Sequence, residues 1–435
     1  MKKIEKLYSA YKQTSGVSTD SRKIIKGCLF FALKGPNFDG NKFAQSALDK
    51  GAKYVVVDDE GYIKKNDKVF LVKDTLMALQ SLAAYHRKKL NPTIIGITGS
   101  NGKTTTKELI REVLSKKYNT HFTKGNYNNH IGVPLTLLQL TKEHEIGIIE
   151  MGANHLKEIE RLCSISLPNW GYITNFGKAH IEGFGNEEGV IKGKSELYNY
   201  LKNYNGKILV NADDKKQLSL SKNSNRFLFG TDLKANFKIK YLNTETQELQ
   251  INYNNVIFKS PLHGKYNLAN IAAAISFGLL FDVPLKLIQK SILDYQSDNN
   301  RSQKLMINKT QIILDAYNAN PTSMEAALNA FAGCKFFQKL VVLGDMFELG
   351  SQSNEEHDSI LRLCIKLKID KICTIGHNFK KASVENDSIY KFENLESFIQ
   401  KFDDNSSIFN GVLIKGSRAM QLENLIPFFK KLWVI

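Results

Sequence analysis

The fold is decided by the stretch from residue 93 to residue 105, Thr93-Ile94-Ile95-Gly96-Ile97-Thr98-Gly99-Ser100-Asn101-Gly102-Lys103-Thr104-Thr105. Its first six residues form an apolar, β-branched run that is typical of a buried strand. The two glycines that follow let backbone N–H groups turn toward an anion, and a helix beginning at Lys103 adds partial positive charge. In such a loop the lysine reaches the β- and γ-phosphates, and the hydroxyl of Thr104 can bind Mg²⁺. The usual pattern has a glycine at Ile97, but the strand–loop–helix context argues against a chance match.

Around this loop, apolar strands alternate with helices. This alternation predicts an α/β fold with a mainly parallel sheet and helices on both of its faces. We expect strands at Thr93–Thr98, Ile146–Glu150, Tyr172–Asn175 and Lys207–Asn211. We expect helices at Lys103–Lys116, Ile131–Leu140, Leu156–Ser164, Glu187–Leu201, Asn267–Leu280 and Leu285–Tyr295.

The remaining pattern predicts three domains, which we place at residues 1–88, 89–297 and 298–435. The first contains short elements and a helix from Thr75 to His86, and a junction before Pro92 separates it from the second. Residues 236–260 alternate apolar and polar side chains and predict an antiparallel hairpin with its turn at Asn254-Asn255, appended to the sheet. A second strand–helix series follows the polar segment 296–300, with strands at Ile312–Asp315, Leu340–Leu343, Ile372–Ile375 and Val412–Lys415.

Three further residues are candidate metal ligands. Glu150 ends an apolar strand, and ligands of open α/β sheets bind at the carboxyl ends of strands. A carboxylate there suits Mg²⁺, although taken alone the residue is better interpreted as a surface glutamate at a strand end. His180 follows the end of another strand, where a ligand role and a structural role are equally open. Lys194 lies in a polar helical stretch, and its spacing alone indicates only a solvated lysine.

Composition indicates an ordinary globular protein. The formal net charge is +17, but the lysines are spread along the chain, which favours a solvated lysine-rich surface over a nucleic-acid site. The five cysteines are scattered and form no C-x-x-C pair, so we expect reduced thiols and no zinc site. The longest apolar stretch, Ile271–Phe281, is shorter than the ~20 residues of a membrane helix. We therefore expect a cytoplasmic monomer with no stable membrane insertion.

The stretch from Gly96 to Thr105 resembles the ATP loop of the Mur ligases, the amide-forming enzymes of peptidoglycan synthesis, and that family uses this variant of the loop. The resemblance covers essentially the whole chain. Further matching motifs are Asp20-Ser21-Arg22, Gly27 to Gly35, Asn126 to Pro134, Glu150 to His155 and His263 to Asn270. Asn41 departs from the family, which usually has histidine after Asp-Gly, and Ala316 stands where a second acidic residue is common.

Two C-terminal motifs narrow the resemblance to one member. Asp315-Ala316-Tyr317-Asn318-Ala319-Asn320-Pro321 and Leu343-Gly344-Asp345-Met346-Phe347-Glu348-Leu349-Gly350 look like those of the ligase that adds D-alanyl-D-alanine to UDP-N-acetylmuramoyl-tripeptide. The resemblance implies a UDP-binding first domain, a central ATP-binding domain and a Rossmann-like third domain. It also implies an acyl-phosphate mechanism, with ATP, two Mg²⁺ ions and the two peptide substrates as partners.

The resemblance assigns roles residue by residue. Lys103, His180 and Lys194 would be catalytic, with Lys194 carbamylated so that a cationic amine becomes an anionic oxygen ligand. The two metal ions would be held by Thr104, Glu150, His180 and Lys194. ATP would be held by Gly99, Ser100, Asn101, Gly102, Lys103, Thr104, Thr105, Asn267, Asn270, Arg301 and Asp315. The UDP-linked tripeptide substrate would be held by Ser21 and Arg22 in the domain that binds its UDP end, and by Asn128 and Asn129 of the substrate loop.

Three rival functions differ in what they require. Folylpolyglutamate synthase shares the ATP loop and the carbamate, but would lack the domain that precedes the loop. A nucleic-acid-dependent NTPase needs clustered basic and aromatic residues, and no such cluster is visible. A nucleotide-binding regulator without chemistry would not need the full set of candidate metal ligands.

Overall fold

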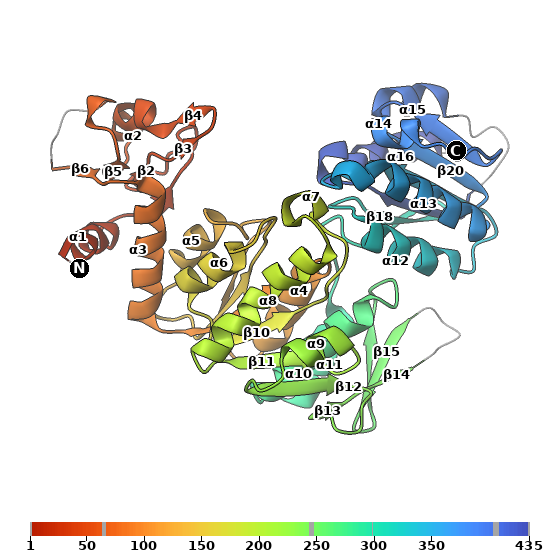
Figure 1. Ribbon diagram of the computed structural model, residues 1–435, viewed down its shortest axis with the longest axis horizontal. Coiled ribbons are helices and arrows are strands. Elements are labelled where there is room, and N and C mark those ends of the chain that lie inside the picture. Colours follow the sequence, from red (N-terminus) through yellow and green to blue (C-terminus); the bar gives the residue numbers. More distant parts are fainter. Residues whose placement is uncertain (1, 63–66, 243–247, 298, 403–408, 434–435) are drawn as a thin grey trace.

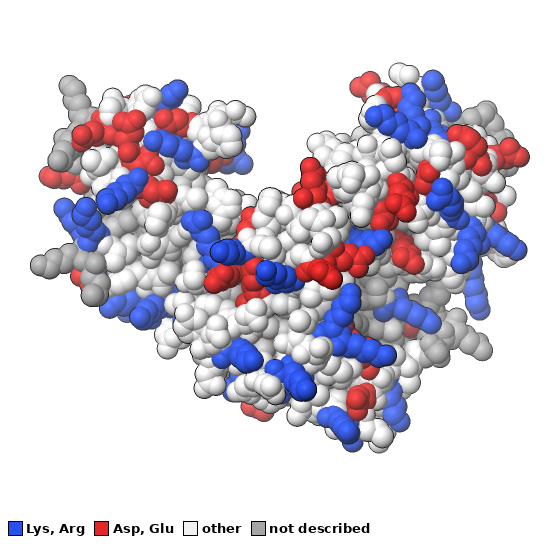
Figure 2. Space-filling view, viewed as in Figure 1, with Lys and Arg blue, Asp and Glu red and all other residues white. Residues whose placement is uncertain are grey.

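The computed structural model describes residues 2–62, 67–242, 248–297, 299–402 and 409–433. An N-terminal lobe and a C-terminal lobe lie on either side of a larger central part (Figure 1). The molecule is hollowed between the two lobes on the face shown in Figure 2, where basic and acidic side chains are interspersed. Among the described residues, no helix is both long enough and apolar enough to cross a membrane.

The N-terminal lobe contains a four-stranded parallel sheet in the order β1-β2-β5-β6. Its strands are β1 (Val17–Ser18), β2 (Leu29–Phe31), β5 (Tyr54–Val57) and β6 (Val69–Leu71), and the hairpin of β3 (Lys34–Gly35) and β4 (Phe38–Asp39) stands apart from them. Its helices are α1 (Lys2–Tyr11), α2 (Ala44–Asp49) and α3 (Thr75–Leu90), with short 3-10 turns at Gly40–Phe43 and Glu60–Tyr62.

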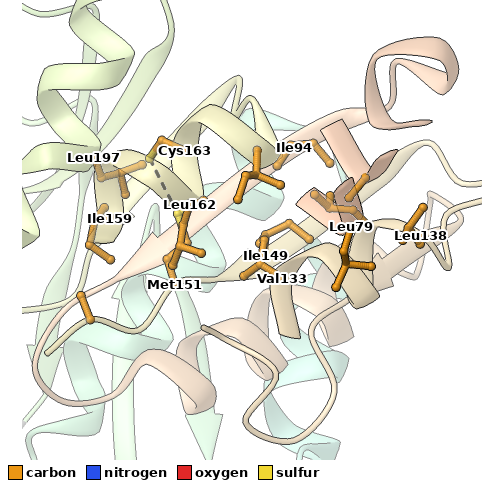
Figure 3. Close-up of a cluster of buried hydrophobic side chains, with 14 of the residues drawn as sticks. Leu79, Ile94, Val133, Leu138, Ile149, Met151, Ile159, Leu162, Cys163 and Leu197 are labelled. Carbon is orange, nitrogen blue, oxygen red and sulfur yellow. Dashed lines mark hydrogen bonds between the residues drawn. The ribbon is translucent and has the colours of Figure 1, made fainter. Parts of the chain in front are cut away.

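Helix α3 joins the lobe to the central part. It begins where the side chain of Asp74 accepts a hydrogen bond from the Met77 N–H, and it ends at Asn91, which has a left-handed φ of 52°. The helix therefore runs four residues beyond the predicted His86. In Figure 3 its Leu79 lies in the same apolar cluster as Val133 and Ile149 of the central part. The N-terminal lobe is thus anchored by a helix that shares the central core.

The central sheet has seven strands in the order β13-β12-β11-β10-β7-β9-β8, and every pairing is parallel. The strands are β7 (Thr93–Thr98), β8 (Thr120–Phe122), β9 (Ile146–Glu150), β10 (Trp170–Ile173), β11 (Lys207–Asn211), β12 (Arg226–Gly230) and β13 (Phe237–Lys238). The parallel sheet expected from the alternation of strands and helices is confirmed.

Helices cover both faces of this sheet, as expected. One apolar core packs α3, α5 (Gly132–Leu137), α6 (Glu158–Ser166) and α8 (Glu187–Asn203) against one face. A second core packs α4 (Lys103–Leu114), α10 (Asn267–Leu280) and α11 (Leu285–Asp294) against the other. The central part also contains the short helices α7 (Ile181–Phe184) and α9 (Lys215–Leu220).

The strand predicted at Tyr172–Asn175 lies two residues earlier in the structure, as β10. Thr174 still donates its N–H to the carbonyl of Thr98, but its side chain and that of Asn175 contact the phosphate loop. Thr174 Oγ1 donates to the carbonyl of Asn101 at 2.5 Å, and the Asn101 N–H donates to Asn175 Oδ1 at 3.0 Å.

The predicted hairpin forms, but as part of a separate antiparallel sheet of β14 (Lys240–Leu242), β15 (Leu249–Tyr253) and β16 (Val256–Ser260). Asn254 and Asn255 make its turn with φ of 48° and 64°, as a two-residue hairpin turn of this type requires. This sheet packs with α10 and α11 rather than extending the central sheet. Residues 243–247 of the predicted segment lie outside the described residues.

The C-terminal lobe has a six-stranded sheet in the order β17-β18-β22-β19-β20-β21, parallel except for the edge strand β17. Its strands are β17 (Gln303–Ile307), β18 (Thr310–Asp315), β19 (Lys339–Gly344), β20 (Lys371–Ile375), β21 (Ile389–Phe392) and β22 (Gly411–Lys415). Its helices are α12 (Pro321–Ala332), α13 (Ser353–Lys366), α14 (His377–Lys381), α15 (Leu395–Lys401) and α16 (Leu425–Leu432), with 3-10 turns at Gly350–Gln352, Arg418–Met420 and Leu422–Asn424. The four strands predicted here are all present.

Candidate active site

A cavity of about 780 Å³ lies at the carboxyl ends of the central strands and is closed on its other side by the C-terminal lobe. The phosphate loop contributes Ser100 to Thr105 to its wall. Most of the predicted site residues line this cavity. Besides those of the phosphate loop, they are Asn128, Asn129, Glu150, His180, Asn267, Asn270, Arg301 and Asp315. The sheet brings them together because the carboxyl ends of parallel strands share one edge.

The phosphate loop needs its two glycines. Gly99 and Gly102 have φ of 140° and 79°, and a Cβ on Gly99 would lie 2.0 Å from Thr174 Oγ1. The ammonium group of Lys103 donates to the carbonyls of Gly99 at 2.8 Å and Ser100 at 3.2 Å. Burial lowers the pKa of Lys103 to about 8, partly opposed by Glu150. The loop therefore holds the ammonium group of Lys103 against its own backbone carbonyls.

Glu150 is the centre of a buried polar cluster. Its Oε2 accepts a hydrogen bond from Thr104 Oγ1 at 2.9 Å, and its Oε1 accepts one from Asn128 Nδ2 at 2.8 Å. Lys107 Nζ lies 3.6 Å from Oε2. Burial on its own raises the pKa of Glu150, but Lys107, Lys103 and Arg301 together hold that pKa below its ordinary value. The carboxylate is therefore ionised beside the hydroxyl of Thr104, which is a pair of oxygen ligands suited to Mg²⁺.

His180 and Lys194 occupy different positions relative to the cavity. His180 lines it, and its Nδ1 contacts the carboxylate of Glu348 from the C-terminal lobe. Lys194 is fully buried behind the wall, where its Nζ donates to the carbonyl of Ala153 at 2.9 Å. Burial, reinforced by the charge of Lys103, holds the pKa of Lys194 well below its ordinary value.

On the C-terminal side, the guanidinium of Arg301 stacks on the ring of Tyr317 at 3.8 Å. Its Nε is buried and has no hydrogen-bond partner among the described residues. Asp315 accepts hydrogen bonds from the Ser302 N–H at 3.1 Å and from Lys415 Nζ at 2.6 Å. Opposite them, Asn270 accepts a hydrogen bond from Thr106 Oγ1 and donates to Asn267 Oδ1, which ties the start of α10 to the loop helix.

Three family models match the chain in succession. "Mur ligase family, catalytic domain" matches residues 13–87, "Mur ligase middle domain" matches 97–278, and "Mur ligase, glutamate ligase domain" matches 300–418. A curated relative from Bacillus subtilis (strain 168), named UDP-N-acetylmuramoyl-tripeptide–D-alanyl-D-alanine ligase, is 34% identical over 429 residues, which are 96% of this chain and 93% of that protein. The chain belongs to the MurF group of the Mur ligase family.

Solved structures of this group have the same fold as this Mur ligase. MurF from Acinetobacter baumannii has a TM-score of 0.86 and 30% identity, covering 99% of this chain and 98% of that one. MurF from Thermotoga maritima, solved in complex with ADP, has a TM-score of 0.85 and 26% identity, covering 96% and 98%.

The predicted residues Ser21 and Arg22 of this Mur ligase do not line the cavity. They lie in the N-terminal lobe, where Arg22 pairs with Asp20 at 2.9 Å and the carbonyl of Ser21 accepts from Lys50 Nζ at 3.0 Å. Asn41, the departure from the family pattern, is fully buried and bonds Asp39 and Asp58 through its Nδ2, each at 2.8 Å. In this chain Asn41 therefore holds two loops of the lobe together.

Sequence reasoning missed four side chains that shape this site of the Mur ligase. Tyr317 and Glu348 belong to the two C-terminal motifs, but the motifs assigned them no role. Lys415 is the last residue of a predicted strand, and Lys107 lies one helical turn after the loop. The position of Lys415 at a strand end was an available signal. For Lys107 the signal was its i, i+3 spacing from Thr104, which places both on one face of α4. Among the described residues, no group of three or more His, Cys, Asp or Glu could hold a metal ion, so any metal here needs other ligands as well.

Proposed function

We propose that this chain is the ATP-dependent ligase that joins D-alanyl-D-alanine to UDP-N-acetylmuramoyl-tripeptide, giving the pentapeptide precursor of peptidoglycan with release of ADP and phosphate. The observation that carries the proposal is the single cavity in which the phosphate loop faces both C-terminal motifs, through Asp315, Asn318, Asn320, Phe347 and Glu348. A nucleotide and a peptide acceptor can therefore meet in one enclosed space. The curated relatives named for this reaction align over nearly the whole chain.

The first step activates the terminal carboxylate of the tripeptide. A carboxylate oxygen attacks the γ-phosphorus of ATP, the bond to the β-γ bridging oxygen breaks, and ADP leaves an acyl phosphate behind. Phosphoryl transfer depends mainly on positioning and on neutralising charge. Lys103 and the loop N–H groups hold the β- and γ-phosphates, while the stacked Arg301 with its unpaired Nε holds the nucleotide from the C-terminal side.

The residues around Glu150 fit a magnesium ion. Thr104 offers a hydroxyl and Glu150 an ionised carboxylate, and both line the cavity. When bound, Mg²⁺ neutralises charge on the β- and γ-phosphates. A single protein carboxylate is enough because this ion commonly completes its shell with phosphate oxygens and water.

A second metal site at His180 and Lys194 requires a carbamate. The lowered pKa of Lys194 favours the neutral amine, whose nitrogen attacks the carbon of CO₂ and loses a proton to give an anionic carbamate. Among the described residues, the buried amine donates to the backbone carbonyl of Ala153, so an anionic group placed toward the cavity fits the site chemically. His180 would share the ion after parting from Glu348.

The second step forms the amide. The neutral amine of D-alanyl-D-alanine attacks the acyl carbon, the tetrahedral intermediate loses a nitrogen proton to solvent and collapses, and phosphate leaves with the oxygen that it received from the carboxylate. Water must be kept from the acyl phosphate, and closure of the C-terminal lobe over the loop serves this purpose. In the N-terminal lobe, Ser21 and Arg22 would hold the UDP end of the substrate, and Asn128 and Asn129 would hold its peptide end at the cavity. We further propose that the protein acts in the cytoplasm, where ATP and nucleotide-linked precursors are found, and that it is a monomer.

A phosphate-release assay tests the function. We expect release only when ATP, a UDP-N-acetylmuramoyl-tripeptide and D-alanyl-D-alanine are all present, and comparing diaminopimelate with lysine tripeptides identifies the natural third residue. Release that ignores D-alanyl-D-alanine would contradict the assignment. Release with a folate and glutamate instead would favour the folylpolyglutamate synthase alternative.

A further inference from the structure

Lys107 is a buried cation that the proposed mechanism does not use. It lies one turn after Thr104 on α4, and only 1% of its side chain is exposed. Its Nζ is 3.6 Å from Glu150 Oε2 and 4.0 Å from Glu108 Oε1, and it lies over the ring of Phe122 at 5.8 Å. Glu150 and Thr104 line the cavity and Lys107 does not, so the ammonium stands inside the protein beside the carboxylate.

Glu150 is therefore already surrounded by positive charge. Lys107 Nζ lies 3.6 Å from its Oε2 with both side chains buried, and Lys103 and Arg301 line the same cavity as Glu150. A divalent cation that binds Glu150 adds two more positive charges to this cluster. Buried charges are poorly screened, so this repulsion weakens the binding of a free cation.

The protein alone also offers that cation few ligands. The described residues contain no cluster of three acidic, histidine or cysteine side chains, and at Glu150 the oxygen ligands are one carboxylate and the hydroxyl of Thr104. Mg²⁺ needs about six oxygen ligands. The triphosphate supplies both the missing oxygens and the negative charge that offsets the surrounding cations.

We infer that Lys107 is the internal counter-ion of Glu150 and makes divalent-cation binding at this site conditional on a bound nucleoside triphosphate. The inference rests on the metal site of the proposed function. Before the nucleotide arrives, the lysine holds the carboxylate in place, in contact with Thr104. It also repels a free cation, so the metal enters together with the triphosphate. Lys107 is a positioning residue, because it acts through Glu150 and touches no substrate.

Manganese binding to the full-length chain tests this role without an activity measurement. Free and bound Mn²⁺ are distinguished by electron paramagnetic resonance, with and without a non-hydrolysable ATP analogue. Wild type should bind Mn²⁺ tightly only with the analogue. Lys107→Met, which keeps the length of the side chain and removes its charge, should bind Mn²⁺ without nucleotide at least about tenfold more tightly than wild type.

Matched variants separate the local charge from other causes. Lys117→Met removes the same charge from a lysine that donates to the carbonyls of Phe281 and Asp282, and it should behave as wild type. Adding Glu150→Gln to Lys107→Met should abolish the gained Mn²⁺ binding. Lys107→Gln should repeat the gain if the methionine variant does not fold, as judged by circular dichroism.

Two results would overturn the inference. One is wild type binding Mn²⁺ equally well with and without the analogue, and the other is a folded Lys107 variant with no gain in nucleotide-free binding. A wild type that binds no Mn²⁺ even with the analogue would instead refute the metal site of the proposed function, and the inference with it.

Discussion

On the central side of the cavity, the polar side chains around Glu150 bind one another and are buried or half-buried. Thr104 and Asn128 both donate to Glu150, and Lys107 lies beside it. On the C-terminal side, Asp315 and Lys415 are also paired, but Glu348 and Arg418 remain 49% and 54% exposed in their side chains. The central wall is thus organised before any ligand binds, whereas part of the C-terminal wall is still solvated.

Polar contacts join the central part to the C-terminal lobe, among them an ion pair of Lys178 Nζ with Glu356 at 2.8 Å. Asn320 Nδ2 donates to Asn101 Oδ1 at 2.8 Å, the Lys178 N–H donates to Thr322 Oγ1 at 3.0 Å, and Glu348 contacts His180. Contacts of this kind are individually weak, so the C-terminal lobe can move relative to the loop. The difference teaches that the loop and the cluster around Glu150 are preformed in this protein, whereas enclosure of the cavity depends on the placement of the lobes.

The largest effect should come from breaking the central wall at Lys103. Lys103→Ala should lower kcat/KM by about three orders of magnitude or more, because the cation that stabilises the transferring phosphate is lost. Thermal unfolding should stay close to that of wild type, since the lysine only contacts loop carbonyls. Steady-state phosphate release measures the first quantity, and retained turnover would refute the phosphate-loop assignment.

Replacing Lys194, which is buried behind the same wall, should cause a smaller loss of activity that can be partly reversed. Lys194→Ala should lower kcat by about a hundredfold. Added short carboxylates such as acetate should restore part of the activity by replacing the carbamate. A variant with full activity and no response to carboxylates would exclude the carbamate role, and acetate added to wild type serves as the control.

Weakening the contact between the walls should change affinity more than rate. Thr322→Val keeps the shape of the side chain but removes the acceptor for the Lys178 N–H, and the lost hydrogen bond should raise the KM for ATP roughly two- to tenfold. Glu325→Gln, an exposed change on the same helix, should leave KM unaltered. A Thr322→Val enzyme that matches this control would show that the contact is not needed in the working state.

The smallest effect on activity at neutral pH is expected from replacing His121, a residue of the central part. Its ring binds the carbonyl of Thr136 at 2.8 Å, and burial lowers its pKa to about 4 from an ordinary 6.5. Between these values the unfolded chain binds the extra proton, so stability is full above pH 6.5 and declines as the pH falls toward 4. This histidine should contribute roughly 1–3 kcal/mol to that decline. Urea unfolding at several pH values should show a shallower decline for His121→Gln, and an identical slope would contradict the assignment.

Much of the central site follows from the sequence because it obeys the rules of parallel sheets. The loop after Thr98 and the carboxylate of Glu150 end two strands, and β7 and β9 are paired so that Ile97 lies beside Glu150. The family motifs add the C-terminal residues that line the cavity. The errors are local: β10 ends before Thr174, whose side chain bonds the loop, and the hairpin near Asn254 forms its own sheet.

The sequence by itself determined the α/β class, the phosphate loop and the strand ends that form the cavity, because periodicity and backbone geometry are local properties. Only the tertiary structure decided which distant side chains meet. Lys107 reaches Glu150 across 43 positions, and His180 reaches Glu348 across 168. Such pairs depend on how helices and lobes pack, and no spacing along the chain records that packing. The charge placed beside Glu150, the proposed metal ligand, is therefore a property of the fold.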